Sequence, residues 1–260
     1  MGHRLRGRVA IVTGASRGIG LSIAQAFADE GASLCLVARN PADLNNVASQ
    51  LDLDSTQVMT QALDVTDRDA CFQAVAAAIQ HFGHVDTLVN NAGVYRSKPF
   101  LDFTPQDFQD MLDVNLFGVL HFTQACLPHM QQQTKGSIIN IASTAGKWGS
   151  RNQSAYNVSK HAVVGLTRCV ALEASPHKVT VNAICPGFVE TDMLDELKAQ
   201  ASHSAGTSIE DFEKAALSRV PLGRMMKPQE IAAMAVFLAS QDATGITGQS
   251  IQMDGGMVLT

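Results

Sequence analysis

The chain has 260 residues, of which 46% are hydrophobic and 17% are charged, and it carries a formal net charge of −5. This length and composition allow a full hydrophobic core, and the acidic balance argues against a nucleic-acid-binding surface. No run approaches the ~18 uninterrupted apolar residues of a membrane-spanning helix, and Val9–Val12 is too short for the apolar region of a signal peptide. We therefore expect a soluble, cytoplasmic protein that neither spans a membrane nor binds nucleic acid.

The cysteines and histidines give no sign of a metal site or of disulfides. The five cysteines are scattered without a C-x-x-C pair, and the eight histidines show no metal-ligand spacing. Because four of the cysteines lie in apolar runs, we expect buried, reduced thiols and no bound metal.

Short apolar runs alternate with helical patterns along the whole chain. The expected strands are Val9–Thr13, Ser33–Ala38, Val58–Leu63, Thr87–Asn90, Ser137–Ala142, Thr180–Ile184 and Ser250–Met253. Helical stretches of about 12 to 20 residues separate them, which is typical of a parallel sheet covered by helices on both faces. The sequence predicts an α/β fold with a doubly wound parallel sheet of about seven strands in three layers. Without a linker or repeat, residues 1–260 are expected to form a single domain.

A glycine-rich turn follows the first expected strand directly and leads into a helix. The turn reads Thr13-Gly-Ala-Ser-Arg-Gly-Ile-Gly20. Gly14, Gly18 and Gly20 let the backbone turn tightly and approach a pyrophosphate, whose charge is stabilised by the N-terminus of the helix. The strand–turn–helix context makes this motif far more specific than glycine spacing alone, so the turn predicts a dinucleotide site.

The end of the second strand indicates which dinucleotide binds. A free ribose 2′-hydroxyl is usually met by an Asp or Glu about 20 residues after the glycines. No acidic residue occurs between Gly31 and Ala42, but Arg39 lies in this region and Arg17 projects from the glycine turn. Two guanidinium groups suit the charge and geometry of a 2′-phosphate. We predict NADP(H) rather than NAD(H), with two solvated surface arginines as the alternative.

The segment 143–160 carries the groups best suited to acid–base chemistry. Ser143 follows the fifth expected strand, and Tyr156 and Lys160 lie four residues apart on one face of the next helix. A nearby ammonium favours the phenolate and lowers the pKa of a tyrosine toward neutral pH. We therefore expect Tyr156 to exchange a proton with a carbonyl or alcohol oxygen while Ser143 holds the same oxygen.

These motifs occur in the order and approximate spacing of one family. The chain resembles the single-domain short-chain dehydrogenases/reductases over essentially its whole length, in the glycine turn, Asn90-Asn-Ala-Gly93, Asn115, Ser143, Tyr156-x-x-x-Lys160 and Pro186-Gly187. The resemblance implies that Tyr156 is the acid/base, that Lys160 assists it and binds the ribose, and that Ser143 orients the carbonyl. It also implies that Asn115 holds a water that links Lys160 to solvent. A satisfied structural amide is the alternative for Asn115.

The resemblance further implies a set of cofactor contacts. Asp64 would hydrogen-bond the adenine, unless it only caps the next helix. Val189 would lie near the nicotinamide carboxamide and Thr191 near the pyrophosphate. The full expected set is Gly14, Ser16, Arg17, Gly18, Ile19, Gly20, Arg39, Asp64, Val65, Asn91, Ala92, Gly93, Tyr156, Lys160, Pro186, Gly187, Val189 and Thr191.

The substrate is predicted from four segments, residues 141–149, 159–166, 185–191 and 219–224, which are similar to the β-ketoacyl and aromatic-polyketide ketoreductases of the family. The similarity implies NADP(H)-dependent reduction of a ketone, on a 3-oxoacyl thioester or polyketide chain carried by acyl-carrier protein or coenzyme A. Basic residues at the predicted mouth would attract such an anionic carrier: Arg96, Lys98, Lys147 and Arg151. The expected substrate contacts are Tyr95, Trp148, Gln153, Phe188, Met193 and Leu197.

Two other functions stay open. One is a dehydrogenase of a small secondary alcohol or hydroxy acid such as 3-hydroxybutyrate. Asn152 and Gln153 stand where that type usually carries a carboxylate-binding lysine. The other is a non-catalytic nucleotide-binding scaffold, since a fold does not dictate activity.

Two regions carry predictions about assembly and motion. The helical stretches 114–130 and 154–174 are apolar around much of their circumference, which is more apolar surface than one sheet face can cover. We therefore predict a homo-oligomer, and the resemblance implies a homotetramer. Residues 192–220 form a long polar–apolar segment, typical either of a lid over the substrate or of a surface pair of short helices.

Overall fold

The fold is built on a single parallel sheet of seven strands. The computed structural model describes residues 3–259, apart from the side chains at 201 and 203–205. The strands are β1 (Val9–Thr13), β2 (Ser33–Ala38), β3 (Val58–Ala62), β4 (Thr87–Asn90), β5 (Gly136–Ile141), β6 (Val179–Pro186) and β7 (Ser250–Met253). Their order across the sheet is β3-β2-β1-β4-β5-β6-β7. The predicted doubly wound sheet is confirmed, and strand ends differ from the prediction by at most two residues.

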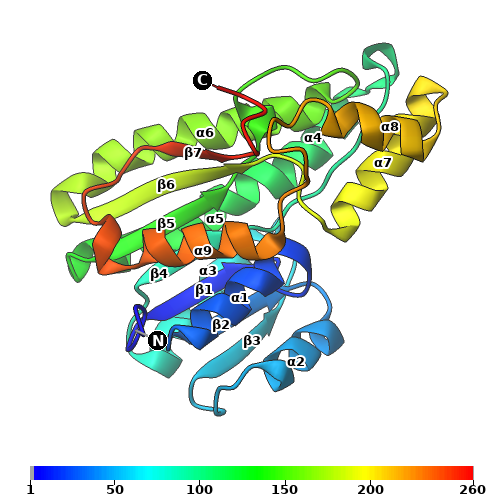
Figure 1. Cartoon of the computed structure of the whole chain (residues 1–260). Helices are drawn as coiled ribbons and strands as arrows, with labels where there is room; N and C mark the ends of the chain where they lie inside the picture. The colour runs from blue at the N-terminus through cyan, green and yellow to red at the C-terminus, as the bar shows by residue number, and fades with distance from the viewer. Residues whose placement is uncertain (1–2, 260) are drawn as a thin grey trace.

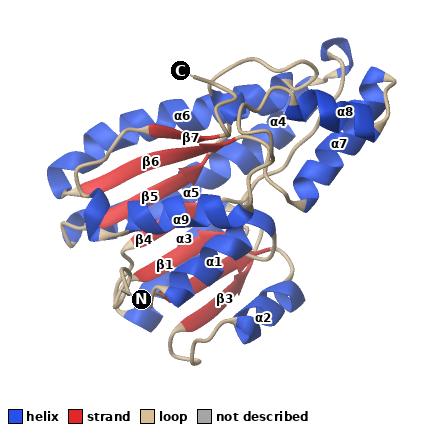
Figure 2. Cartoon of the chain, in the orientation of Figure 1, coloured by secondary structure: helices blue, strands red, loops and turns tan. Residues whose placement is uncertain are grey.

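Helices cover both faces of this sheet (Figure 2). On one face lie α1 (Gly18–Asp29), α2 (Pro41–Gln50) and α9 (Pro228–Ala239), and on the other α3 (Arg68–Phe82), α5 (Gly118–Gln132) and α6 (Ser154–Ala174). Successive side chains of a strand point to opposite faces, so Ala10 and Val12 pack in the first core while Val9 and Ile11 pack in the second. This is why the strands read as continuous apolar runs.

The chain order of the strands reverses between β1 and β4. The chain builds outward from β1 through β2 to β3, and then crosses to β4 and builds outward to β7 (Figure 1). The loops that follow β1 and β4 therefore leave in opposite directions at the carboxyl ends of adjacent strands. Such a reversal opens a crevice in doubly wound sheets, and ligands bind there.

Buried amides and hydroxyls connect the centre of the sheet to the helices behind the crevice. Asn90 and Asn140 are register partners on β4 and β5. Asn90 Nδ2 donates to Asn140 Oδ1 at 2.9 Å and to Thr123 Oγ1 on α5 at 3.2 Å, and Asn140 Nδ2 donates to Thr167 Oγ1 on α6 at 2.9 Å. All four residues are at most 4% exposed. Because such bonds are costly to break, they fix the position of α6 relative to β5.

One helical prediction needs correction. The expected helix over 114–130 begins as a π-helical turn (Asp113–Phe117), which continues directly from α4 (Pro105–Leu112), and becomes α5 only at Gly118. Residues 192–220 form α7 (Asp192–Ala205) and α8 (Ile209–Leu217), which is the predicted pair of short helices. Both helices lie beyond the carboxyl ends of the strands (Figure 1).

The remaining sequence predictions on thiols, metals and membranes can be compared with the described residues. Cys35, Cys71, Cys126 and Cys185 are buried and Cys169 is exposed, and all five are free thiols. Within residues 3–259, no cluster of His, Cys, Asp or Glu side chains is arranged to hold a metal ion. None of the described helices combines the length and the apolar character needed to cross a membrane.

Candidate active site

Among the described residues, two neighbouring cavities open at the carboxyl ends of the strands. The first, of about 400 Å³, contains Tyr95 and Tyr156 and is called the tyrosine cavity. The second, of about 350 Å³, contains Arg17 and Arg39 and is called the arginine cavity. The two share a set of lining residues: Ile19, Asn91, Gly93, Val94, Thr191 and Met193. They therefore adjoin along these residues and form one continuous groove.

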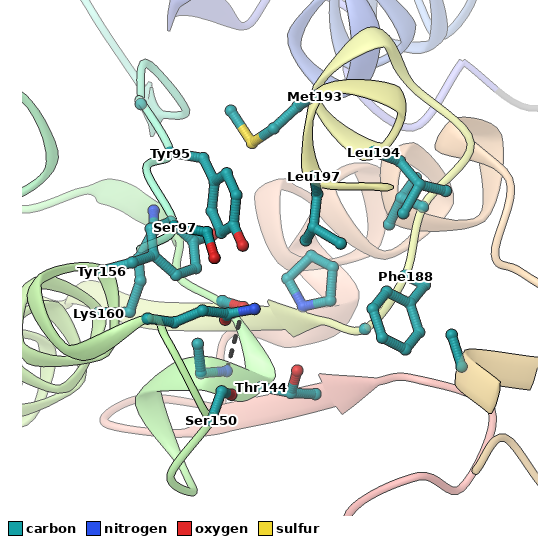
Figure 3. A pocket seen from close by; sticks show the side chains of 18 of the residues that line it. Tyr95, Ser97, Thr144, Ser150, Tyr156, Lys160, Phe188, Met193, Leu194 and Leu197 are labelled. Carbon is teal, nitrogen blue, oxygen red and sulfur yellow. Dashed lines mark hydrogen bonds between the residues drawn. The ribbon is translucent and has the colours of Figure 1, made fainter. Parts of the chain in front are cut away.

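The expected acid–base residues, Ser143, Tyr156 and Lys160, all border the tyrosine cavity. Figure 3 shows Tyr156 and Lys160 there. Ser143 lies two residues after the end of β5, where its hydroxyl accepts a hydrogen bond from the Ala145 N–H at 3.1 Å. Lys160, on α6, donates from Nζ to the Ile141 carbonyl at 2.9 Å. Its ammonium lies 5.8 Å from the centre of the Tyr156 ring. The end of β5 and the first turns of α6 thus bring the three groups together.

The electrostatics of this wall differ from the sequence prediction. Burial raises the pKa of Tyr156, and a hydrogen bond with Ser143 only partly offsets this effect. Burial also lowers the pKa of Lys160 to about 8. The expected depression of the tyrosine pKa is therefore wrong for this structure, because desolvation outweighs the stabilisation of the phenolate and the Lys160 ammonium is held by a backbone carbonyl. At neutral pH the phenol is protonated, which is the form that can donate to a ketone oxygen.

Asn115 lies behind this wall, within the π-helical turn, and is fully buried. Its Nδ2 donates to the Val94 carbonyl and to Ser159 Oγ, both at 3.0 Å, and its Oδ1 accepts from the Val94 N–H at 2.8 Å. Ser159 in turn donates to the Tyr156 carbonyl. The amide thus links the loop after β4 to α6, as the structural alternative predicted. One lone pair of Oδ1 is left for a further partner, so the predicted water relay stays a prediction.

The glycine turn shapes one wall of the arginine cavity and reaches the tyrosine cavity at Ile19. Helix α1 has no side-chain cap and no acidic residue in its first turn, all of which the structure describes. Its first residues, Gly18 and Ile19, border the arginine cavity, so the positive end of the helix is open to the groove. Gly14 and Gly18 have φ values of 64° and 57°, which favour glycine, and both border the arginine cavity. Gly20 does not border either cavity. A Cβ there would lie 2.2 Å from the Gly14 carbonyl oxygen, so Gly20 permits close packing of α1 on the turn.

The arginine cavity brings together the residues predicted to select the dinucleotide. Arg39 and Arg17 are exposed and border it, and Arg17 forms a 3.5 Å ion pair with Asp192. Asp64 also borders this cavity and accepts from the Thr66 N–H at 3.0 Å. Asp67 is the residue that caps α3, so the helix-cap alternative for Asp64 is wrong.

The tyrosine cavity is bordered by all six residues predicted to contact the substrate, which are Tyr95, Trp148, Gln153, Phe188, Met193 and Leu197. Sequence reasoning missed a second group, Ser97, Thr144, Leu194, Phe212 and Arg219. The apolar positions of α7 and α8 are visible in the sequence, but the side of each helix that faces the cavity depends on how the pair packs. Arg219 stacks over the Trp148 ring, 4.2 Å from its centre.

The four predicted basic residues do not act together at the mouth. Arg96 and Lys98 both pair with the buried Asp107, Lys98 at 2.6 Å, and Arg96 also lies 3.7 Å from Asp110, so two carboxylates face the two cations and largely neutralise them. Lys147 donates to Ser250 Oγ at 3.0 Å. Of the four, only Arg151 is found among the described residues that border the cavity.

Comparisons with known proteins agree with this geometry. A family model described as short chain dehydrogenase matches residues 8–202. The chain is 38% identical over 256 residues to the 3-oxoacyl-(acyl-carrier-protein) reductase of Thermotoga maritima, with 98% of this chain and 100% of that protein covered. It is 38% identical over 252 residues to a protein of Streptomyces virginiae named as a ketoacyl reductase of the monensin polyketide synthase (96% and 97% covered). It is 34% identical over 256 residues to the gluconate 5-dehydrogenase of Gluconobacter oxydans (98% and 96% covered).

The buried ammonium of Lys160 predicts a measurable cost in stability. Below pH 8 the folded protein must keep this charge in a desolvated position, whereas the unfolded chain solvates it up to its ordinary pKa of 10.5. We expect Lys160→Met to raise the free energy of unfolding at pH 7 by about 1–3 kcal/mol. The gain should shrink as the pH rises from 8 to 10.5, because the native protein then releases its proton before the unfolded chain does.

Urea unfolding at pH 7 and pH 10 measures this difference. Lys214→Met, on the exposed side of α8, is the matched control and should change stability by less than about 0.5 kcal/mol at either pH. A Lys160→Met protein less stable than wild type at pH 7 would show that the Ile141 hydrogen bond outweighs desolvation.

Proposed function

The chain belongs to the short-chain dehydrogenase family and is therefore an oxidoreductase, and from this premise we propose that it reduces a ketone to a secondary alcohol with NADP(H). One observation carries the proposal. Ser143, Tyr156 and Lys160 meet on the wall of a cavity that continues into a groove lined by the glycine turn. This arrangement supports a proton donor at one end of a groove whose lining suits a dinucleotide.

The groove suits a nicotinamide dinucleotide in three respects. The free N-terminus of α1 supplies backbone N–H groups and a positive dipole end for a pyrophosphate, and Gly14 and Gly18 allow close approach. Asn91, Ala92 and Gly93 border the middle of the groove. The nicotinamide half would lie along Pro186, Gly187, Val189 and Thr191, which border the tyrosine cavity. When bound, the cofactor supplies the hydride.

The protein supplies placement and the proton. Tyr156, protonated at neutral pH, donates its proton to the ketone oxygen, and Ser143 donates a hydrogen bond to the same oxygen. In this proposal the charged ammonium of Lys160 favours the phenolate that forms and binds the cofactor ribose. Asn115 holds the loop after β4 against α6. We also propose that a water beside Asn115 relays protons from solvent.

The cavity favours a hydrophobic ketone. Phe188, Leu194 and Leu197 form an apolar wall that would accept an acyl or polyketide chain. Arg151 and Arg219 border the same cavity and could attract the phosphate groups of coenzyme A or an acyl-carrier protein. Two of the relatives have names that refer to 3-oxoacyl or ketoacyl reduction. We therefore propose a 3-oxoacyl thioester or polyketide-type ketone as the substrate.

A dehydrogenase of a small hydroxy acid or polyol is the second candidate, favoured by the similarity to gluconate 5-dehydrogenase. The apolar wall argues against a polyol, because its hydroxyl groups would lose hydrogen bonds there. NADPH oxidation followed spectrophotometrically with β-ketothioesters, diketones, quinones and simple ketones separates the candidates. Turnover of none of them would support the non-catalytic scaffold.

We also propose that α7 and α8 form a lid over the tyrosine cavity. Leu194, Leu197 and Phe212 of these helices border it, and Gln200 Oε1 on α7 accepts from the Ser97 N–H across it at 2.9 Å. This bond ties the helix pair to the opposite wall.

Tyr156→Phe tests the acid–base assignment. We expect turnover to fall about 100- to 10,000-fold, because only the proton donor is removed. The ring and its contact with Tyr95 remain, so NADPH binding, followed by fluorescence titration, should change little. A Tyr156→Phe enzyme with near-normal turnover would contradict the mechanism.

Arg39→Ala tests the choice of cofactor. We expect the KM for NADPH to rise about tenfold or more, with kcat/KM for NADH nearly unchanged, because only NADPH carries the phosphate that the guanidinium would bind. Arg68→Ala, at the exposed start of α3, is the control. Wild-type protein that used NADH as well as NADPH at equal concentration would refute the preference.

A homotetramer is proposed because the outer surface of α6 and the turn before α5 keep exposed apolar side chains. Phe117 is 37% exposed, Val158 47% and Leu172 78%. A second copy would cover them most simply. Light scattering should give a mass near four times 27.7 kDa, and Leu172→Lys should shift it toward smaller species. A stable 27.7 kDa species in the wild type would contradict the proposal.

A further inference from the structure

Tyr95 stands where the loop after β4 borders the tyrosine cavity. Its ring meets that of Tyr156 edge to face, with 5.2 Å between ring centres and 74° between ring planes. Figure 3 shows its hydroxyl directed into the cavity, on the side where Ser97 lies. The two phenol rings therefore lie side by side on the wall of the same cavity.

The Tyr95 hydroxyl is buried without a protein partner. The residue is only 9% exposed, and its oxygen makes no hydrogen bond to any residue that the structure describes. Ser97 and Gln153 lie near enough to influence its ionisation, but neither forms a hydrogen bond of normal geometry with it. Buried hydroxyls in folded proteins are nearly always satisfied, so this one points to an acceptor that enters the cavity.

Burial also determines the protonation state of the Tyr95 side chain. It raises the pKa of Tyr95 to about 12, so the phenol keeps its proton throughout the physiological range. Tyr156 has different neighbours, because a hydrogen bond with Ser143 partly offsets the effect of burial on its pKa and the Lys160 ammonium lies 5.8 Å from its ring centre. Tyr95 is therefore suited to donate a hydrogen bond to an oxygen, and not to exchange its proton.

The acceptor belongs to the substrate. In the proposed reaction Ser143 and Tyr156 hold the ketone oxygen, and the remaining wall near Tyr95 includes the apolar Met193 and Leu197. A carbonyl two carbon atoms from the ketone would bring a second acceptor within reach of a ring packed directly against that of Tyr156. We propose that the Tyr95 hydroxyl donates a hydrogen bond to this second carbonyl oxygen and makes β-dicarbonyl compounds (3-oxoacyl esters and thioesters, 1,3-diketones) the preferred substrates. The inference rests on the proposed ketone reduction.

Tyr95→Phe, assayed with a matched pair of ketones, tests this contact. Ethyl acetoacetate carries the second carbonyl, and 2-heptanone has a chain of the same length without it. The substitution removes one hydroxyl and keeps the ring that packs on Tyr156. We expect the KM for ethyl acetoacetate to rise about 5- to 20-fold with little change in kcat, while kcat/KM for 2-heptanone falls by no more than about twofold.

Thermal unfolding gives an independent measurement. Because the hydroxyl makes no hydrogen bond within the described protein, the Tyr95→Phe midpoint should be equal to or higher than that of the wild type. An equal loss on both ketones would show that Tyr95 only places Tyr156 and would overturn the inference. No loss on either ketone, or a lower midpoint, would also overturn it. If the wild-type protein reduces neither ketone nor any other carbonyl compound, the proposed function is refuted. The proposed Tyr95 contact, which rests on that function, is then refuted as well.

Discussion

The hydrogen bond from the buried ammonium of Lys160 to the Ile141 carbonyl is the interaction on which the site depends. It joins α6 to the end of β5. The Lys160 side chain is only 5% exposed, so keeping its charge there costs solvation free energy. The Asn140–Thr167 bond holds the same two elements together deeper in the core. With α6 fixed in this way, Tyr156 faces Ser143, two residues after the end of β5. The position of the phenol is thus a consequence of how one helix is bound to one strand.

Two tyrosines on the wall of one cavity show how environment separates chemical roles. Both phenols are buried enough to raise their pKa values. Tyr156 has a hydrogen-bonding serine, which partly offsets the effect of burial, and a cation 5.8 Å from its ring centre. Tyr95 is close to Ser97 and Gln153, which are neutral groups. One ring is therefore suited to move a proton and the other to bind an oxygen, although the residue type is the same.

The role of a charged side chain also depends on which partners the folded protein brings to it. Arg96, Lys98, Lys147 and Arg151 look equivalent in the sequence, but Asp107 accepts from two of them and Ser250 from a third. Asp107 lies within eleven residues of its partners, yet no sequence rule identifies it as their acceptor, because the loop conformation decides which cation reaches it. Arg219 was missed for the same reason. Its stacking on Trp148 joins two segments about 70 residues apart in the sequence.

The sequence by itself determined the alternation of strands and helices, the glycine turn and the pairing of Tyr156 with Lys160 on one helical face. These features depend on local periodicity and on contacts between residues close in the chain. Only the tertiary structure decided that Gly20 packs under the turn and not along the groove, that Asn115 is satisfied by Val94 and Ser159, and that burial raises the pKa of Tyr156. Each of these depends on desolvation and on distances between segments far apart in the chain. Such quantities exist only once the sheet and its helices have packed.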